Sequence, residues 1–253
     1  MRTLFLDIET APNLGYTWAK WEQNVIGFQR ERYMLCFSYK WAHEKKVHVI
    51  SQIDYANDFA KDPFDDTALL MALWPLLNEA DVIIGHNVVK FDLKMINAFF
   101  VLKGIAPPSP YQTIDTLLIA RRYFAFNSNS LGDLLEALEL GEKLSTGGFG
   151  LWTGCMRGDA ASWRKMIRYS RRDTDRLPPL YERLRPFMRN HPTMNHGNPE
   201  ACPVCNEAGH LKKDGIRYTK TGQYQGYWCA ACGSYPSDRT LNKQAVKPER
   251  VHR

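Results

Sequence analysis

Long apolar runs are missing from this sequence, and neither sign of charge dominates it. No segment approaches the roughly 18 apolar residues that a membrane-spanning helix needs, and a carboxylate at Asp7 comes too early for a secretory leader. Of the 253 residues, 24% are charged and 44% hydrophobic, which excludes a disordered or fibrous chain. The sequence predicts a soluble, cytoplasmic protein with one sizeable core domain and an appendage.

The net charge is only moderately positive, at +6. This balance tolerates a polyanionic partner without requiring one. Most of the excess lies in residues 191–253, which hold nine lysines and arginines against five acidic residues. The C-terminal part is therefore where a nucleic-acid partner is favoured most.

Cysteine is scarce, and its placement argues against a disulfide framework. Four of the six cysteines form two C-x-x-C pairs, Cys202/Cys205 and Cys229/Cys232, with 23 residues between the pairs. Thiolates at this spacing are typical ligands of a structural zinc ion, and the pattern resembles a zinc ribbon. A segment of about 50 residues can hardly build a core of its own, so zinc is expected to hold residues 202–253 together.

An apolar strand near the N-terminus ends in two carboxylates. Asp7 and Glu9 are two residues apart, and side chains at this spacing on a strand share a face. Both carboxylates therefore project from one rigid element, while Leu6 and Ile8 face the core. An Asp-x-Glu pair alone is a weak signal, because acidic residues flank many strands.

Hydrophobic periodicity predicts an α/β fold. Strands are expected over residues 2–9, 33–41, 46–51 and 81–86, which are apolar, aromatic or β-branched. The first three are expected to be antiparallel neighbours. Helices are predicted over residues 65–77, 92–103, 116–123, 131–140 and 162–177. The predicted fold class is a mixed sheet flanked by helices.

Two stretches without clean periodicity are interpreted as loops. Residues 10–32 lie beside the first carboxylates and contain Trp18 and Trp21, which either stack on a nucleic-acid base or pack onto the domain. Residues 141–158 are rich in glycine and are predicted to be a mobile loop that covers substrate.

Further acids stand where elements begin. Asp92 follows a buried strand and starts a helix, so it either caps that helix or joins a site with the first carboxylates. Asp115 also starts a strand-to-helix segment, where it either supports a site from behind or lies on the surface.

The helix predicted over residues 162–177 carries the last candidates. Tyr169 and Asp173 are one turn apart, so both project from the edge of its buried stripe. Pro178 and Pro179 are expected to kink or end the helix, with a last helix at 180–188. A solvated basic face, rather than a phosphate track, is favoured for three arginines on the far side: Arg164, Arg168 and Arg172.

Four acids make up the candidate site: Asp7, Glu9, Asp92 and Asp173. Carboxylates in one cleft repel one another strongly unless divalent cations neutralise them. Oxygen ligands favour Mg²⁺ or Mn²⁺ over zinc. Two such ions about 3.5–4 Å apart can activate a water and stabilise the leaving oxygen in phosphodiester hydrolysis. The expected substrate is therefore a nucleic-acid strand.

Together these segments resemble the DEDD superfamily of 3′→5′ exonucleases. The matching motifs, in the superfamily's order, are Asp7-x-Glu9, Asn87-x-x-x-Phe91-Asp92 and Tyr169-x-x-x-Asp173. The tyrosine of the third motif is similar to the tyrosine subclass, DEDDy, which includes polymerase proofreading domains. The resemblance covers about residues 1–190 and implies a ribonuclease H-like fold.

The resemblance also implies roles for the site residues. The four acids would bind two Mg²⁺ or Mn²⁺ ions, and Tyr169 would orient the attacking water. The organisation it implies is a stand-alone nuclease, similar to small exonucleases encoded by phages. The exonuclease domain would span residues 1–190, a linker residues 191–201, and a zinc ribbon with a basic tail residues 202–253.

The leading function is release of nucleoside 5′-monophosphates from the 3′ end of single-stranded or frayed DNA. Contacts to the strand are expected from Thr10, Trp18, Trp21, Asn87, Lys212, Lys213, Arg217 and Lys220. The zinc ribbon is expected to grip the strand, with a structural or protein-docking role as the alternative. Two other functions stay open: an exoribonuclease, since no residue identifiably reads a 2′-hydroxyl, and a catalytically silent nucleic-acid-binding adaptor. A replication or repair partner is compatible with the leading function.

Overall fold

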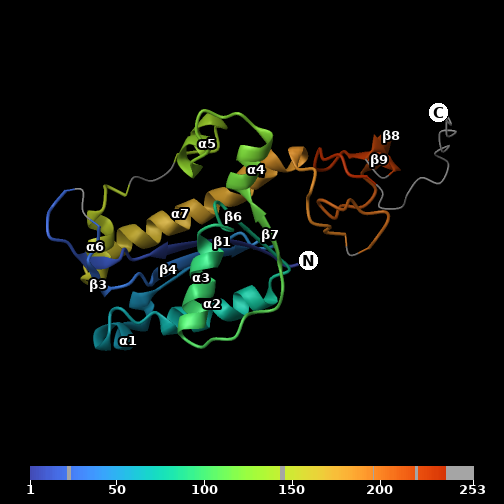
Figure 1. The fold of residues 1–253 in the computed structure, drawn as a ribbon. Helices are drawn as coiled ribbons and strands as arrows, with labels where there is room; N and C mark the ends of the chain where they lie inside the picture. The colour runs from blue at the N-terminus through green and yellow to red at the C-terminus, as the bar shows by residue number, and fades with distance from the viewer. Residues whose placement is uncertain (22–23, 143–145, 196, 220–221, 238–253) are drawn as a thin grey trace, which may run out of the picture. The chain divides into compact units, whose positions relative to one another are not determined.

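The computed structural model describes residues 1–253 apart from 22–23, 143–145, 196, 220–221 and 238–253 (Figure 1). The chain divides into two compact units, residues 2–181 and residues 182–253 together with Met1. No helix among the described residues is both long enough and apolar enough to cross a bilayer.

A five-stranded mixed sheet lies at the centre of the first unit, in the order β5-β4-β1-β6-β7. Strand β1 pairs antiparallel with β4 and parallel with β6, β5 is antiparallel to β4, and β7 is parallel to β6. The strands span Thr3–Thr10 (β1), Met34–Trp41 (β4), His48–Ser51 (β5), Val82–Gly85 (β6) and Gln112–Asp115 (β7). The predicted mixed sheet with flanking helices is confirmed.

Helices cover both faces of this sheet (Figure 1). Leu4, Leu6 and Ile8 of β1 are buried in a core to which α2 and α3 contribute. The alternate residues of β1 face α7, as the contact between the rings of Phe5 and Tyr181 illustrates. The helices span Ala56–Lys61 (α1), Thr67–Glu79 (α2), Asp92–Leu102 (α3), Thr116–Tyr123 (α4), Leu131–Ala137 (α5), Gly150–Met156 (α6) and Ala160–Leu184 (α7), with 3₁₀ turns at Gln52–Tyr55 and Arg185–Phe187.

Helix α7 continues through both prolines, so an end of the helix at Pro178 and Pro179 and a separate helix at 180–188 are wrong. A proline inside a helix costs about 3 kcal/mol. Leu177 and Leu180 are almost completely buried and Tyr181 is buried against β1, and each such side chain contributes roughly 1.5–3 kcal/mol. Packing against the sheet offsets the penalty that the local sequence imposes.

Both predicted loops contain regular structure. Residues 10–32 hold an antiparallel ribbon of β2 (Leu14–Tyr16) and β3 (Gly27–Arg30). The stretch 141–158 holds helix α6, whose apolar residues are buried beside α7. Gly154 stands inside this helix because a Cβ there would lie 2.7 Å from Cβ of Ser162. The glycines that suggested mobility thus include one required by close packing, and a mobile lid over substrate stays a prediction.

The second unit contains an antiparallel hairpin of β8 (Leu211–Tyr218) and β9 (Gln223–Cys229). Its buried cluster consists of Cys202, Val204, Cys229 and Cys232, with Cys205 and Leu211 packed against it. Three of the four buried members are the predicted zinc ligands. The cysteines themselves therefore form most of the core, as expected where a metal replaces a hydrophobic core.

Candidate functional site

The first two carboxylates lie near the end of β1 and are half-buried. In the ladder with β4, Asp7 pairs with Ser38 and Glu9 with Cys36. The pairing shifts register immediately after Glu9. Irregularities of this kind bend a strand locally and change the direction of the side chains beside them.

Asp92 is held against the backbone between these two residues. Strand β6 pairs with β1 only as far as Phe5, and beyond that point the Ile8 N–H donates to Oδ1 of Asp92 at 3.0 Å. The first residue of α3 is thereby fixed to β1, and Asp92 is only 3% exposed. The capping alternative is wrong, because the cap residue of α3 is Phe91 and no side chain caps the helix.

A tight turn between β6 and α3 brings Asp92 to this place. Gly85 ends β6 with no room for a side chain, since a Cβ would lie 2.9 Å from the carbonyl oxygen of Leu6. Asn87 adopts a φ of +68°, a left-handed conformation that asparagine tolerates better than most residues. The Asn87 carbonyl then accepts from the N–H of Phe91 at 2.9 Å.

Asp115 holds that turn from the neighbouring strand. Its Oδ1 accepts from the N–H of Asn87 at 2.9 Å and its Oδ2 from the N–H of Val89 at 3.1 Å. Oδ1 also caps α4 by accepting from the N–H groups of Leu117 and Leu118. Asp115 is 4% exposed, so the surface alternative is wrong. In the sequence, Asp115 could be recognised only as an aspartate at the start of a helix. Nothing in the sequence indicated that it also holds the turn between β6 and α3.

Helix α7 brings the third motif to the same face of β1. The Ser38 hydroxyl donates to the carbonyl oxygen of Ser170 at 2.9 Å and lies 2.7 Å from Oγ1 of Thr174. Ser38 is also the ladder partner of Asp7. These contacts fix α7 beside the carboxylates and leave Tyr169 and Asp173, on the adjoining edge of the helix, close to them.

The electrostatics agree with this proximity. Burial raises the pKa of Tyr169, and the negative charges of Asp173, Glu9 and Asp7 raise it further. The Tyr169 hydroxyl therefore stays protonated at any ordinary pH and can take part in hydrogen bonds as a donor.

Burial also dominates the titration of Asp92. Burial raises its pKa to about 7, the charge of Asp115 adds to the increase, and the hydrogen bond from Ile8 opposes it. A bound cation would favour the ionised form. The carboxylates do not form a cluster as tight as that of the cysteines, which are the compact group of metal-ligating side chains found in the described part of the chain.

The two predicted indole contacts are exposed. Trp18 is 87% and Trp21 74% exposed, so neither packs onto the domain. Nζ of Lys20 lies 5.0 Å from the centre of the Trp21 ring. Thr10 and Asn87 are half-buried. The ribbon region thus presents aromatic faces and a cation to solvent, which is the surface chemistry of single-strand binding sites.

In the second unit, the ligand atoms of Cys202, Cys205, Cys229 and Cys232 all lie within 4.8 Å of one another. Two of the Sγ–Sγ distances are 3.9 Å and 3.8 Å. A tetrahedral zinc with Zn–S bonds of about 2.3 Å places its sulfurs about 3.8 Å apart. The Val204 N–H also donates to Sγ of Cys202 at 3.4 Å. The four cysteines lie close enough together to bind one zinc ion.

The predicted basic contacts lie on the hairpin beside this cluster. Lys212 and Lys213 are exposed on β8, and Nζ of Lys212 lies 5.7 Å from the centre of the Trp228 ring. Arg217 forms an ion pair with Asp214, so its charge is partly neutralised. Lys220 lies outside the described residues.

Comparison with known proteins finds a solved structure of similar fold. No protein-family model matches the sequence, and no curated protein matches it. A family B DNA polymerase from the hyperthermophilic archaeon Pyrobaculum calidifontis is similar in structure, with a TM-score of 0.55 and 16% sequence identity. The likeness is one of fold. It covers 73% of this chain but 24% of the polymerase, so the chain matches about a quarter of that protein.

We expect the stability of the first unit to fall as pH rises from about 4 to about 7 in buffer without added divalent ions. The unfolded chain loses the Asp92 proton near the ordinary pKa of 3.8, whereas the folded protein keeps it until about 7, so unfolding is favoured as pH rises. Asp92→Asn keeps an acceptor for Ile8 and should be more stable than the unaltered protein at pH 8, on the order of 2–4 kcal/mol. Urea unfolding at pH 4.5, 6 and 8 measures this, and parallel pH profiles for the two proteins would contradict it.

Asp115→Asn should lower the free energy of unfolding by about 1–3 kcal/mol, because one of its two acceptor oxygens becomes a donor facing buried N–H groups. The measurement is urea unfolding followed by circular dichroism. The exposed residue Asp58 supplies the control, since Asp58→Asn should change stability little. Equal effects of the two substitutions would mean that Asp115 does not hold the turn.

Cys229→Ser should release the metal of the second unit and unfold its hairpin, because three thiolates and a hydroxyl bind zinc more weakly than four thiolates. The zinc content of the purified protein and the protection of β8 and β9 amides from hydrogen exchange report the two effects. Cys155→Ser is the control, since Cys155 lies in α6 of the first unit. Zinc retained at one ion per chain by Cys229→Ser would exclude this ligand set.

Proposed function

We propose that the first unit is a metal-dependent 3′→5′ exonuclease acting on single-stranded or frayed DNA and releasing nucleoside 5′-monophosphates. The observation that carries the proposal is the meeting of three segments far apart in the sequence. Asp92 accepts from Ile8 between Asp7 and Glu9, and α7 is fixed to the residue paired with Asp7. This is the arrangement expected if the three motifs form one site.

The likeness of fold supports the same proposal. The similar solved structure is a DNA polymerase, and the three motifs resemble those of polymerase proofreading domains. In the central sheet, the strands β1, β4 and β5 come first along the chain, followed by helices α1 and α2, strand β6 and helix α3. This order agrees with a ribonuclease H-like fold. DNA is therefore the favoured polymer, and RNA is one outcome of the test below.

The donor chemistry of the acidic residues suits Mg²⁺ or Mn²⁺ ions. Their donors are carboxylate oxygens, which these hard cations prefer, and the raised pKa of Asp92 shows that the site disfavours its own negative charge. Asp7, Glu9, Asp92 and Asp173 would hold the ions. When bound, these ions would supply an activated water and charge stabilisation for the leaving oxygen.

The chain itself would position the reactants. The protonated hydroxyl of Tyr169 would hydrogen-bond the attacking water and hold it in line with the scissile bond. The turn built by Gly85, Asn87 and Asp115 would keep Asp92 rigid during the reaction. The exposed indoles of Trp18 and Trp21 would stack on bases of the strand. The zinc ribbon, through Lys212 and Lys213, would grip the strand by its phosphates.

The test is a gel time course with 5′-labelled DNA and RNA of one sequence, each with a free or a blocked 3′ end, in Mg²⁺ or Mn²⁺. We expect a ladder that shortens from free 3′ ends, and faster cleavage of DNA. Asp7→Asn should lower turnover by about 10²–10³-fold, the size expected when one preorganised electrostatic group is removed.

Asp58→Asn is the matched control, since it removes one carboxylate from the exposed surface of α1 and should leave turnover unchanged. Faster cleavage of RNA would make the protein an exoribonuclease. Intact strands in both metals, from folded protein that still binds the probe, would make it a binding adaptor. Cleavage that Asp7→Asn does not slow would overturn the assignment of the site.

A further inference from the structure

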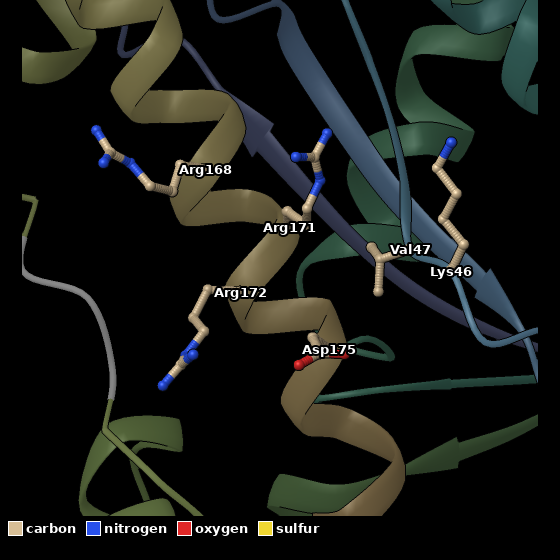
Figure 2. Close-up of a pocket in the computed structure, with 6 residues that line it drawn as sticks. All are labelled: Lys46, Val47, Arg168, Arg171, Arg172 and Asp175. Carbon is tan, nitrogen blue, oxygen red and sulfur yellow. The ribbon is translucent and has the colours of Figure 1, made fainter.

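A basic groove lies on the outer side of α7, and none of the four candidate metal-binding acids lines it. Its volume is about 770 Å³, and we call it the α7 groove. It is lined by Lys46, Val47, Arg168, Arg171, Arg172 and Asp175. Figure 2 shows Arg171 on the side of α7 that faces Lys46 and Val47, while Arg168 and Arg172 project to the other side of the helix. The cationic surface therefore extends across α7.

The groove uses a different face of α7 from the candidate active site. Positions 168, 171, 172 and 175 follow one another at helical spacing and form an outward stripe. The buried side chains of Ser170, Thr174 and Leu177 define the opposite, inward stripe. One helix thus carries the third motif on its inner edge and a row of arginines outside.

Much of the positive charge in this groove is available to a ligand. Among the described residues, no acidic side chain lies within ion-pair distance of any of the four cations that line it. Arg172 is tied to the protein by its Nε, which donates to the carbonyl oxygen of Glu142 at 3.4 Å. Arg168, Arg171 and Lys46 are exposed, and Asp175 is the one acid among the lining residues.

The groove differs from an ordinary solvated helix face because it has a second wall. Lys46 and the buried Val47 come from the turn between β4 and β5, not from α7. The β4–β5 turn therefore converts the arginine stripe into a concave surface with an apolar patch. Concave sites lined by one sign of charge concentrate their field and attract extended polyanions.

We infer that the α7 groove binds the phosphates of a nucleic-acid strand away from its cleaved end, an inference that rests on the proposed function. Guanidinium groups bind phosphate oxygens through two parallel hydrogen bonds. Arg168 and Arg172 are about 6 Å apart along the helix axis, so they reach different phosphates rather than one. The volume of the groove and its several cations fit a strand better than a single inorganic anion.

The test compares two double variants that each remove two positive charges. Arg168→Gln/Arg171→Gln alters the groove, and Arg121→Gln/Arg122→Gln alters exposed arginines on α4. Binding of a 3′-blocked, fluorescent 20-nucleotide DNA is measured by anisotropy at several salt concentrations, without added Mg²⁺ or Mn²⁺. Thermal unfolding confirms that all variants are folded.

The groove variant should weaken binding about 25-fold at 0.1 M salt and reduce the slope of log K against log salt by about 1.4. These values follow from a slope of about 0.7 for each phosphate of a single strand that an arginine neutralises. The α4 variant should change both much less, and Arg168→Lys/Arg171→Lys should restore the slope. Hydrolysis of a trinucleotide, which offers the groove few phosphates, should differ among the proteins much less than binding of the 20-nucleotide strand.

Equal weakening by the two double variants would overturn the inference, and so would polyglutamate binding as tightly as DNA with the same dependence on the arginines. The proposed function fails separately. If the 20-nucleotide strand binds through the groove but is never shortened in Mg²⁺ or Mn²⁺, the exonuclease is excluded and the groove stands. If free 3′ ends are shortened normally and the groove variant binds like the unaltered protein, only the groove is excluded.

Discussion

The first unit depends on one hydrogen bond, from the Ile8 backbone to Asp92, which are 84 residues apart in the sequence. It replaces sheet pairing at the point where β6 ends. The buried N–H of Ile8 would otherwise lack this hydrogen-bond partner. It also fixes the start of α3 against β1. The turn geometry of Gly85 and Asn87 keeps Asp92 within reach of that donor. Asp115 holds the same turn by accepting from the N–H groups of Asn87 and Val89.

This arrangement sets charge against burial. A carboxylate that is nearly inaccessible to water is stabilised in its neutral form, so burial raises the pKa of Asp92 to about 7, and the charge of Asp115 adds to the increase. A protein selected for stability alone would place apolar residues here. A ligand that supplies positive charge would explain the acids, and this is the role that the proposed function gives to divalent cations.

Helix α7 combines two chemistries on opposite faces. Inward, hydroxyl contacts with Ser38 and the burial of Leu177 and Leu180 hold it on the sheet and let it run through two prolines. Outward, three of its arginines line a groove together with residues of the β4–β5 turn. The second unit differs, because its buried cluster contains little apolar surface and is made up mostly of cysteines that lie within 4.8 Å of one another.

Local patterns in the sequence determined four strands of the central sheet, most helices, the placement of Asp7 and Glu9 on one face of a strand, and the four cysteines. These properties depend on periodicity and spacing over a few residues, which a single segment contains. Only the tertiary structure decided that Asp92 bonds to Ile8, that Asp115 supports a turn, that Trp18 and Trp21 are exposed, and that α7 survives Pro178 and Pro179. The positions of Asp92, Asp115 and α7 depend on burial and on hydrogen bonds between distant segments, and these interactions outweigh local preferences. The exposure of the two indoles depends on which surfaces the rest of the fold leaves open to them.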